Sequence, residues 1–238
     1  MGGHCGSGAL RDLTEWAQLG WGTQVPTEGL VFALGGAVDF VYVRCARLWP
    51  QTYVVGRGGG LEEDYLSRIG AGFCVRSTDD PVAGWAWVTG EIDAGRPVMV
   101  WADIAELPYL RVQLSMSRHD IVITGYDDDD QLAYVVDNDR DTTQSVPYQN
   151  LRRARSSTGF PVPTRHTTYL IDWPHTVPDL AAHRSRPGRS RRARAGRERG
   201  VDARRRCWAA DPPRRGCRSD RSRCGGCAAL CRRSALLA

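Results

Sequence analysis

The sequence contains no lysine, so all 32 of its basic residues are arginine. This bias is typical of a GC-rich coding sequence and is not a requirement of any fold. No run of about 18 apolar residues is present, and a membrane-spanning helix is therefore not expected. The first residues, Met1 to Cys5, lack the basic and apolar regions of a secretory signal peptide. We therefore expect a cytoplasmic protein that is not associated with a membrane.

Charge of the two signs is divided unequally along the chain. Residues 1–183 contain 14 Arg and 23 Asp or Glu, a net charge of −9, whereas residues 184–238 contain 18 Arg and 4 acidic residues, a net charge of +14. An acidic N-terminal part argues against nucleic acid as its specific ligand, because neutralising phosphates requires clustered cations. Its three cysteines, Cys5, Cys45 and Cys74, are irregularly spaced, which favours reduced thiols over a disulfide framework.

The composition changes near Pro178. The segment that follows consists mainly of Arg, Ala, Gly, Ser, Pro and Cys, which cannot bury enough apolar surface to offset the entropy of ordering. Its single CxxC, Cys224 to Cys227, lacks a second pair at zinc-finger spacing, so no metal is predicted. The segment could bind nucleic acid non-specifically, and out-of-frame translation of GC-rich DNA would give the same composition. We predict one domain over residues 1–178 and a disordered tail over residues 179–238.

Within residues 1–178, helical and strand patterns alternate. The spacing of apolar residues predicts helices over residues 7–19, 27–34, 61–69, 81–94 and 149–156. Runs rich in β-branched and aromatic residues predict strands over residues 39–43, 52–55, 73–76, 97–101, 119–126, 132–137 and 167–172. Thr27 and Asp80 are expected N-caps, and Gly70 is expected just beyond a helix C-terminus. The fold class predicted is α+β.

Cys5 is a candidate nucleophile because of its position two residues before the first predicted helix. A thiol at a helix N-terminus faces unpaired N–H groups and the positive end of the helix dipole, which stabilise the reactive thiolate. Glycines at positions 2, 3, 6 and 8 allow close backbone approach and leave room for a substrate. The alternative is that Cys5 is merely a small residue near a frayed terminus.

His119 and Asp137 lie on the two strands of a predicted hairpin. If its acidic turn is centred on Asp128, the two residues are direct cross-strand partners with Cβ atoms roughly 4.5–5.5 Å apart. A carboxylate beside an imidazole fixes its tautomer and stabilises the imidazolium, the orienting role in a nucleophile–base–acid set. A register shifted by two residues would put Asp139 in that role, whereas Asn138 points to the other face. A one-residue bulge would invalidate the argument.

Taken in order, three segments resemble the family of the N-terminal domain of butirosin biosynthesis protein H and, more distantly, bacteriocin-processing cysteine peptidases and other papain-like enzymes. The segments are Gly3-His4-Cys5-Gly6-Ser7-x-Ala9-Leu10, His119-x-Ile121-Val122-Ile123-x-Gly125-Tyr126-Asp127 and Tyr134-Val135-Val136-Asp137. The resemblance extends over residues 1–178. It implies a papain-like fold in which an N-terminal helix carrying the cysteine packs on an antiparallel sheet carrying the histidine and the aspartate.

The resemblance also implies an activity, a cysteine-dependent acyl transfer in secondary metabolism that needs no cofactor. Cys5 would take an (amino)acyl group from an acyl carrier protein or a small-molecule donor and pass it to an amine-bearing small-molecule acceptor. His119 would deprotonate Cys5 and later the amine, and Asp137 would orient His119. His4, Gly6 and Tyr109 are assigned to oxyanion or substrate binding, and a residue that starts the helix is the alternative role of His4. A cysteine peptidase or amidohydrolase, or a truncated non-catalytic binding module, are the alternatives.

The sequence departs from this family pattern in two places. Papain-like enzymes usually carry a glutamine several residues before the cysteine, but here only four residues precede Cys5, so either His4 substitutes or the true start lies upstream. The second, mostly helical domain that normally follows is also not recognisable. Two other features are read as structural: His166 as a core or rim residue, and the glycine-rich run at residues 56–60 as a loop near the substrate cleft rather than a phosphate-binding loop.

Overall fold

The computed structural model describes residues 3–22, 25–36, 38–46 and 51–179. Its helices are α1 (Cys5–Trp16), α2 (Glu28–Leu34), α3 (Leu61–Arg68), α4 (Pro81–Asp93), the short 3-10 helix η1 (Ile104–Glu106) and α5 (Tyr148–Arg155). Its strands are β1 (Val41–Arg44), β2 (Thr52–Val55), β3 (Gly72–Arg76), β4 (Val98–Ala102), β5 (His119–Asp127), β6 (Leu132–Val136), β7 (Gln144–Pro147) and β8 (Thr168–Asp172). The predicted α+β class is confirmed. The predicted tail, apart from Asp179, lies outside the described residues.

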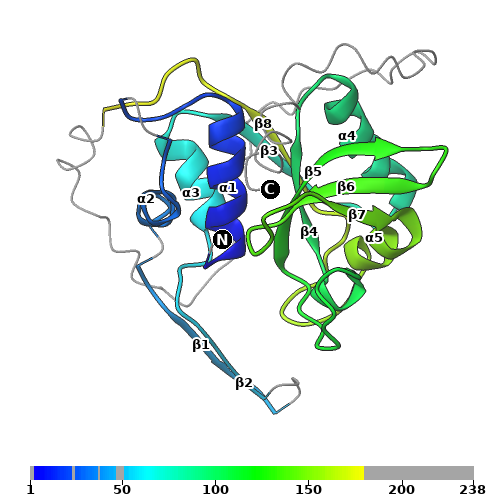
Figure 1. The fold of residues 1–238 in the computed structure, drawn as a ribbon. Helices are drawn as coiled ribbons and strands as arrows, with labels where there is room; N and C mark the ends of the chain where they lie inside the picture. Colours follow the sequence, from blue (N-terminus) through cyan, green and yellow to red (C-terminus); the bar gives the residue numbers. More distant parts are fainter. Residues whose placement is uncertain (1–2, 23–24, 37, 47–50, 180–238) are drawn as a thin grey trace.

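Six strands form one sheet in the order β3-β8-β4-β5-β6-β7, and all neighbours are antiparallel (Figure 1). Strand β7 was not predicted because Gln144 to Pro147 contains a single aliphatic residue, Val146. Proline is tolerated there because β7 is the last strand of the sheet, where a missing N–H leaves no ladder partner unpaired. The sheet thus extends one strand further beyond β6 than the sequence pattern indicates.

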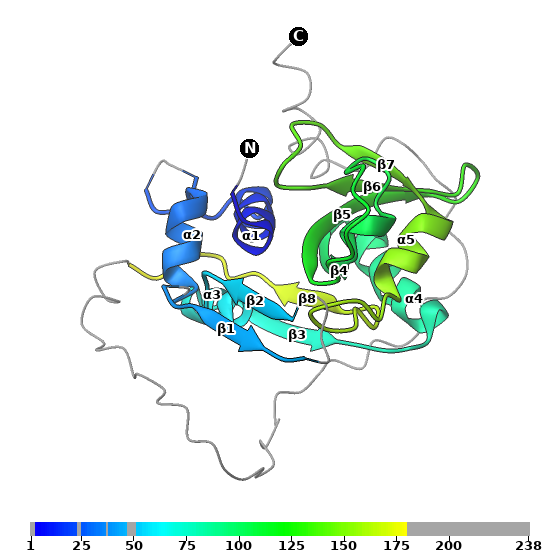
Figure 2. The same ribbon diagram turned by 90° about the horizontal axis from the view of Figure 1, so that it is seen from below.

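Helices cover both faces of this sheet. Helices α1, α2 and α3 lie on one side, and α4 and α5 lie on the other (Figures 1 and 2). The apolar core is divided in the same way, because successive side chains of a strand point to opposite faces of the sheet. Met99 and Val122 pack in the cluster on the α1 side. Their neighbours Val100 and Ile121 pack in the cluster on the α4 side. Both faces of the central strands are therefore buried, which accounts for their nearly continuous apolar sequences.

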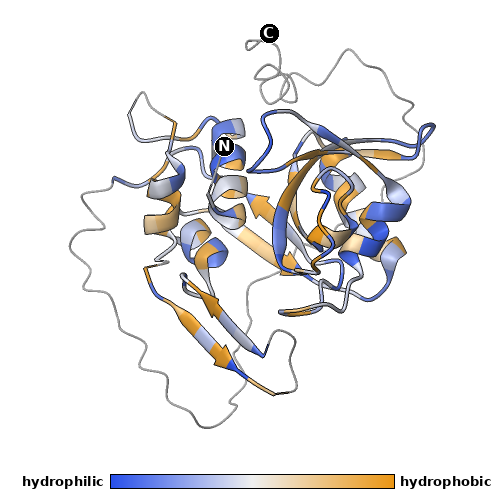
Figure 3. Cartoon of the chain, turned by 60° about the horizontal axis from the view of Figure 1, so that its bottom comes forward, coloured by the Kyte–Doolittle hydropathy of each residue, from blue (hydrophilic) through white to orange (hydrophobic). Residues whose placement is uncertain are grey.

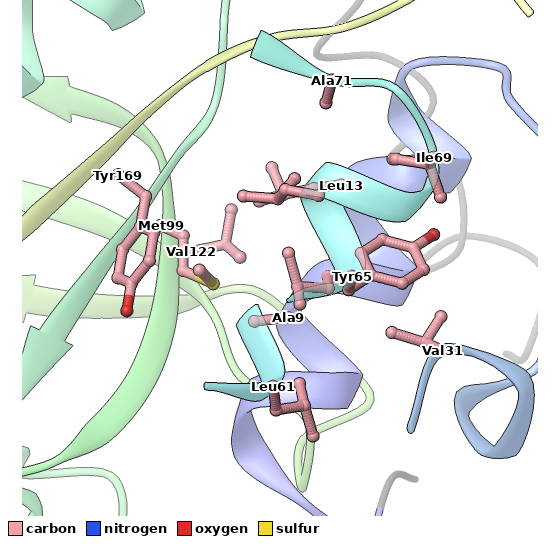
Figure 4. Packing of buried hydrophobic residues seen from close by; sticks show 12 residues of the cluster. Ala9, Leu13, Val31, Leu61, Tyr65, Ile69, Ala71, Met99, Val122 and Tyr169 are labelled. Carbon is pink, nitrogen blue, oxygen red and sulfur yellow. The ribbon is translucent and has the colours of Figure 1, made fainter. Parts of the chain in front are cut away.

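Helix α1 is fixed to the sheet by its apolar stripe. Leu10 and Leu13 are completely buried, and burial of each side chain contributes about 1.5–3 kcal/mol to stability. Figure 4 shows Leu13 and Ala9 between α3 and the sheet residues Met99 and Val122. The packing holds the first turn of α1 at a fixed place against the start of β5.

The predicted helix ends agree with the structure at several positions. Thr27 and Asp80 are N-caps whose side chains accept hydrogen bonds from Leu30 N–H at 3.3 Å and Val82 N–H at 2.8 Å. Gly70 has a φ of +79°, the left-handed conformation expected just beyond a helix. These local signals depend on residues close in sequence, which is why the sequence alone predicts them.

The β1–β2 hairpin forms a separate two-stranded sheet that extends away from the rest of the molecule (Figure 3). One of its faces carries Phe40, Tyr42 and Val54, which are 70%, 57% and 61% exposed. On the other face Tyr53 contacts Phe160, with ring centroids 4.6 Å apart. The hairpin is thus attached to the body by one face only.

None of the helices in the described part of the chain has the length and apolar character needed to cross a lipid bilayer.

Candidate active site

Cys5 is the first residue of helix α1, which begins two residues earlier than predicted. The N-cap is His4, whose Nδ1 accepts the N–H of Ser7 at 3.2 Å. Histidine is an unusual cap, so the sequence gives no cap signal at the true start of the helix. Burial lowers the pKa of His4, and the Arg57 guanidinium lowers it further, so the ring is a neutral acceptor at neutral pH. Of its two roles considered above, the structure places His4 in the capping one.

The carboxylate of Glu28 holds the segment before α1 in place. Its oxygens accept the N–H groups of Gly3 at 2.9 Å and His4 at 2.7 Å and the hydroxyl of Ser7 at 3.1 Å. Burial opposes its ionisation, but the hydrogen bonds from Gly3 and His4 keep the pKa of Glu28 below its usual value. Sequence analysis missed this residue because a contact across 24 positions leaves no periodic signal.

His119 and Asp137 form the predicted imidazole–carboxylate pair. His119 Nε2 lies 2.8 Å from Asp137 Oδ2, and the side chain of His119 is 14% exposed whereas that of Asp137 is fully buried. Burial raises the pKa of Asp137, but the hydrogen bond and the charge of His119 outweigh this effect and hold it below its usual value. The carboxylate is therefore ionised beside the ring.

The imidazole of His119 has Cys5 as a second partner. Burial disfavours its charged form, yet hydrogen bonds to Asp137 and Cys5, together with their negative charge, raise the pKa of His119 to about 10. At neutral pH the ring is thus an imidazolium between a carboxylate and a sulfur. The three residues proposed from the sequence are gathered in one place by α1, the first residue of β5 and the residue after β6.

The hairpin register differs from the one used to predict this pair. Val122 pairs with Val136 and Ile123 with Val135, and a bulge follows between Ile123 and Gly125. The register is therefore shifted by two residues, so His119 is not directly opposite Asp137. Because the shift is even, both side chains remain on the same face of the sheet. The predicted cross-strand pairing was wrong, but the contact between the two side chains exists.

The two neighbours of Asp137 do not replace it. Asp139, the alternative for a shift of two, is bound instead to Arg140 through Oδ2 at 3.1 Å. Asn138 points away toward α1, where a Cβ on Gly8 would lie 2.4 Å from its own Cβ. Strand β6 ends at Val136, so the chain leaves the ladder at Asp137 and its side chain reaches back to His119.

Tyr109 lies behind the carboxylate. Its hydroxyl donates to Asp137 Oδ2 at 2.6 Å, and Arg140 stands over its ring at 5.8 Å. Burial and the charge of Asp137 raise the pKa of Tyr109, so the hydroxyl keeps its proton and remains a donor. The structure places Tyr109 as a support for Asp137, with its hydroxyl on the same carboxylate oxygen that binds His119.

A buried cluster of charged residues lies beneath the first turn of α1. Glu62 accepts from Arg57 at 2.9 Å and from Arg118 at 3.1 Å, and Asp120 Oδ2 lies 3.8 Å from Cys5 Sγ. A Cβ on Gly6 would approach Glu62 Oε1 to 2.6 Å, so only glycine fits at this position. Sequence analysis assigned Gly6 to substrate binding and did not detect the cluster, whose members are far apart in the chain.

His166 belongs to the other helical layer. It is buried against Gly84 of α4. Its backbone N–H donates to the carbonyl oxygen of Arg155 at 2.7 Å, and its own carbonyl oxygen accepts from the Arg155 guanidinium at 3.0 Å. It also borders a pocket of about 430 Å³ formed with residues of α4 and α5, which none of Cys5, His119 and Asp137 lines. This placement agrees with the structural role expected from the sequence.

No three His, Cys, Asp or Glu side chains gather in a geometry that could hold a metal ion in the part of the chain that the structure describes. None of the described cysteines Cys5, Cys45 and Cys74 forms a disulfide. The reactive groups that meet at this site are the Cys5 sulfur, the His119 imidazole and the carboxylates around them.

Comparison with known protein families matches residues 4–138, more than half of the chain, to the family described as "Butirosin biosynthesis protein H, N-terminal". The matched segment contains Cys5, His119 and Asp137 and ends shortly after β6. It is shorter than the span of 1–178 over which the sequence resemblance was expected. A search of curated proteins found none that matches the chain.

Proposed function

The chain belongs to the family of butirosin biosynthesis protein H N-terminal domains, and from this premise we propose that it is a cysteine-dependent acyltransferase of antibiotic biosynthesis with a papain-like scaffold. The family is named after an enzyme of aminoglycoside biosynthesis, and membership indicates a role in such a pathway. The observation that carries the specific activity is the position of the His119 ring, between Asp137 and the Cys5 sulfur at the start of a helix.

The resting state suited to this chemistry is an imidazolium–thiolate pair. The thiolate is the nucleophilic form of a cysteine, and the imidazolium of His119, whose pKa is raised to about 10, would stabilise it. Here the proposal refines the sequence-based mechanism, in which His119 would deprotonate Cys5 during the reaction. In the refined mechanism the ring acts as the cation beside the sulfur from the start.

In the first half-reaction the sulfur of Cys5 attacks the thioester carbonyl of an acyl carrier protein. A carbon–sulfur bond to Cys5 forms, the bond to the carrier sulfur breaks, and the departing thiolate takes the proton of the His119 imidazolium. The backbone N–H of Cys5, at the N-terminus of α1, is the best candidate for stabilising the oxyanion.

In the second half-reaction an amine attacks the acyl group on Cys5. The acylated sulfur carries no negative charge, so one cause of the raised pKa of His119 is removed and the neutral ring can accept the amine proton. The amide bond forms, the bond to Cys5 breaks, and the imidazolium–thiolate pair is restored. Asp137 remains ionised throughout and orients the ring.

The proposal is tested by intact-protein mass spectrometry after incubation with acyl-carrier thioesters. A mass increase equal to the acyl group, located on the peptide that contains Cys5, is the expected result. Addition of amine acceptors should then remove the adduct and release an amide. Release of the free acid alone, at the same rate with and without amines, would favour the hydrolase instead.

Cys5→Ala is the variant that must form no adduct, and Cys74→Ala is the matched control that must form it at the wild-type rate. Cys74 lies in β3, and no part of the proposed chemistry involves its thiol. If the wild-type protein binds carrier thioesters but is never acylated, the chain is a binding module and the proposed activity is wrong.

A further inference from the structure

The residue that follows His119 also reaches Cys5. Asp120 lies on the opposite face of β5 from His119, against α1, and its Oδ2 is 3.8 Å from Cys5 Sγ, within hydrogen-bonding distance for sulfur. It is completely buried, and its Oδ1 makes no hydrogen bond to any residue that the structure describes. An unsatisfied carboxylate oxygen in the interior is costly unless the group carries a proton or serves a function.

Gly6 brings the first turn of α1 directly onto Asp120. A Cβ on Gly6 would lie 3.1 Å from Asp120 Oδ2 and 2.6 Å from Glu62 Oε1, so the helix backbone sits on both carboxyl groups. Glu62 is compensated by ion pairs to two arginines, at 2.9 and 3.1 Å. Among the residues that the structure describes, none forms a comparable ion pair with Asp120, although Arg118 lies two positions before it in the chain.

The groups around Asp120 come from several elements. They are Cys5 and its neighbour His4 at the start of α1, Arg57 before α3, Glu62 in α3, Arg118 and His119 at the start of β5, Tyr169 in β8, and Asp137, which is reached through His119. His4 and Tyr169 are neutral at pH 7, because burial lowers the pKa of His4 and raises that of Tyr169.

The acidic groups in this cluster outnumber its cations by one. The cations are Arg57, Arg118 and the His119 imidazolium, three in all, whereas four groups can be anions: Glu62, Asp137, Asp120 and Cys5. Buried charges are tolerated when they are paired, so the cluster balances when three of its four acidic groups are ionised. Glu62 and Asp137 each have a cation at hydrogen-bonding distance, which leaves Asp120 and Cys5 to compete for the proton.

We propose that Asp120 is a further catalytic residue of this site, which shares a single proton with the Cys5 sulfur and thereby controls when the thiolate forms. This inference rests on the proposed function of Cys5 as the nucleophile. When Asp120 holds the proton, its carboxylic acid donates a hydrogen bond to the thiolate. When the proton is on the sulfur, Asp120 is ionised and Cys5 does not react.

The pKa of Asp120 places this proton exchange near neutral pH. Burial and the nearby charge of Glu62 raise the pKa of Asp120 to about 7, against the opposing effect of Arg118, Arg57 and His119. Two interacting acids lose their protons in two shared steps rather than independently. The reactivity of Cys5 should therefore rise with pH in two steps, the second of which completes near neutral pH.

The experiment measures the rate of iodoacetamide alkylation of the Cys5 peptide against pH, read by mass spectrometry. Wild-type protein should show two steps. Asp120→Asn keeps the shape of the side chain but removes the competing acid, so it should show one step at lower pH, with alkylation about tenfold faster on the acid side of the wild-type profile. Asp64→Asn, an exposed carboxylate of α3, is the matched control and should leave the profile unchanged.

A single step in the wild-type protein, or a profile that Asp120→Asn leaves in place, would overturn the inference. The wild-type measurement needs no variant and decides the matter if Asp120→Asn fails to fold. Alkylation does not depend on acyl transfer, so the two proposals fail separately: absence of an acyl adduct refutes the transferase, whereas absence of coupling refutes only the role of Asp120.

Discussion

Two buried histidines at different places in the fold behave in opposite ways. Beside the N-terminus of α1, His119 lies between Asp137 and Cys5, and its pKa is raised to about 10. Against α4, His166 is buried near Arg155, and its pKa is lowered to about 4; none of the described carboxylates lies at hydrogen-bonding distance from its ring. Burial disfavours the charged form of both rings, so their partners determine the difference.

The same contrast extends to the residues around each histidine. Beneath α1 the buried arginine Arg57 is paired with the carboxylate of Glu62. Around His166, Arg155 donates to the carbonyl oxygens of Gly84 and His166 and to the hydroxyl of Thr168, and burial lowers its pKa. Ionisable groups surrounded by counter-charges can exchange protons, whereas those bound to backbone carbonyls hold segments together. We therefore expect substitutions around His119 and Cys5 to change reactivity, and substitutions around His166 and Arg155 to change stability.

The largest effect is expected for Asp137→Asn. Loss of the carboxylate removes the main stabilisation of the His119 imidazolium and the control of its tautomer, so acylation of Cys5 should slow by roughly 10³–10⁴-fold. The measurement is the rate of adduct formation with a carrier thioester at saturating concentration. The matched control is Asp139→Asn, which changes a carboxylate bound to Arg140 and should leave the rate within a factor of about three. Equal losses in both variants would contradict the assignment of Asp137.

In the region packed against α4, the loss of stability at acid pH should be determined by the protonation of His166. The unfolded chain protonates this residue near pH 6.5, but the folded protein resists protonation down to about pH 4, so lowering the pH through this window favours unfolding. The lost free energy of unfolding is about 3 kcal/mol, which corresponds to the difference between the two pKa values. Denaturant unfolding at several pH values should show that this part of the dependence disappears in His166→Asn.

Asparagine is the suitable replacement because position 166 has a φ of +49°, a conformation that asparagine tolerates better than most residues. The acylation rate of this variant at neutral pH should stay within a factor of about three of the wild-type rate, since surface and structural changes away from a site have small effects on it. A tenfold loss of acylation would show that the surroundings of the two histidines are coupled and would invalidate the comparison.

A smaller loss of stability is expected for Gly84→Ala. The added Cβ would lie 2.5 Å from the Cβ of His166, so helix α4 must move away from the segment before β8, at a cost of about 2 kcal/mol. Gly90→Ala in the same helix is the control, because nothing lies within 4 Å of its Cβ and alanine favours the helix by about 0.5–1 kcal/mol. Chemical denaturation should therefore give shifts of opposite sign for the two variants.

The elements of the fold were predictable because their signals are local. Caps such as Thr27 and Asp80, the glycine at position 70 and the apolar spacing of each helix depend on neighbours within a few residues. The register of the β5–β6 hairpin was not predictable, because the turn is not centred on Asp128 and a bulge between Ile123 and Gly125 then shifts the pairing by one residue, and neither feature has a distinct sequence pattern. An even shift preserved the shared face of the two side chains, and the inference about their contact survived for that reason.

The polar surroundings of the site could not be predicted, for a different reason. Glu28 binds the segment before α1 across 24 positions, and Asp120 reaches Cys5 across 115. Strand alternation places the Asp120 side chain on the opposite face from His119, so the sequence does not indicate that both reach Cys5. Helix α1 packs on that face, and its first residue lies at the end of the strand where both side chains are within reach. The approach of both side chains to Cys5 therefore depends on how α1 packs against β5, which the sequence pattern does not give.

The smallest effect on reactivity is expected for Tyr109→Phe. The variant removes one of the two donors to Asp137 Oδ2, a hydrogen bond of 2.6 Å, and leaves the bond to His119 in place. A hydrogen bond to a charged group contributes about 1.5–3 kcal/mol, but only part of it should reach the reaction, because the imidazole still fixes the carboxylate. We expect acylation of Cys5 to slow by roughly tenfold. Tyr148→Phe, which removes a hydroxyl bound to Asp128 on the α4 side, is the matched control and should leave the rate unchanged. If Tyr109→Phe is as slow as Asp137→Asn, the hydroxyl takes part in the chemistry and is more than a support for Asp137.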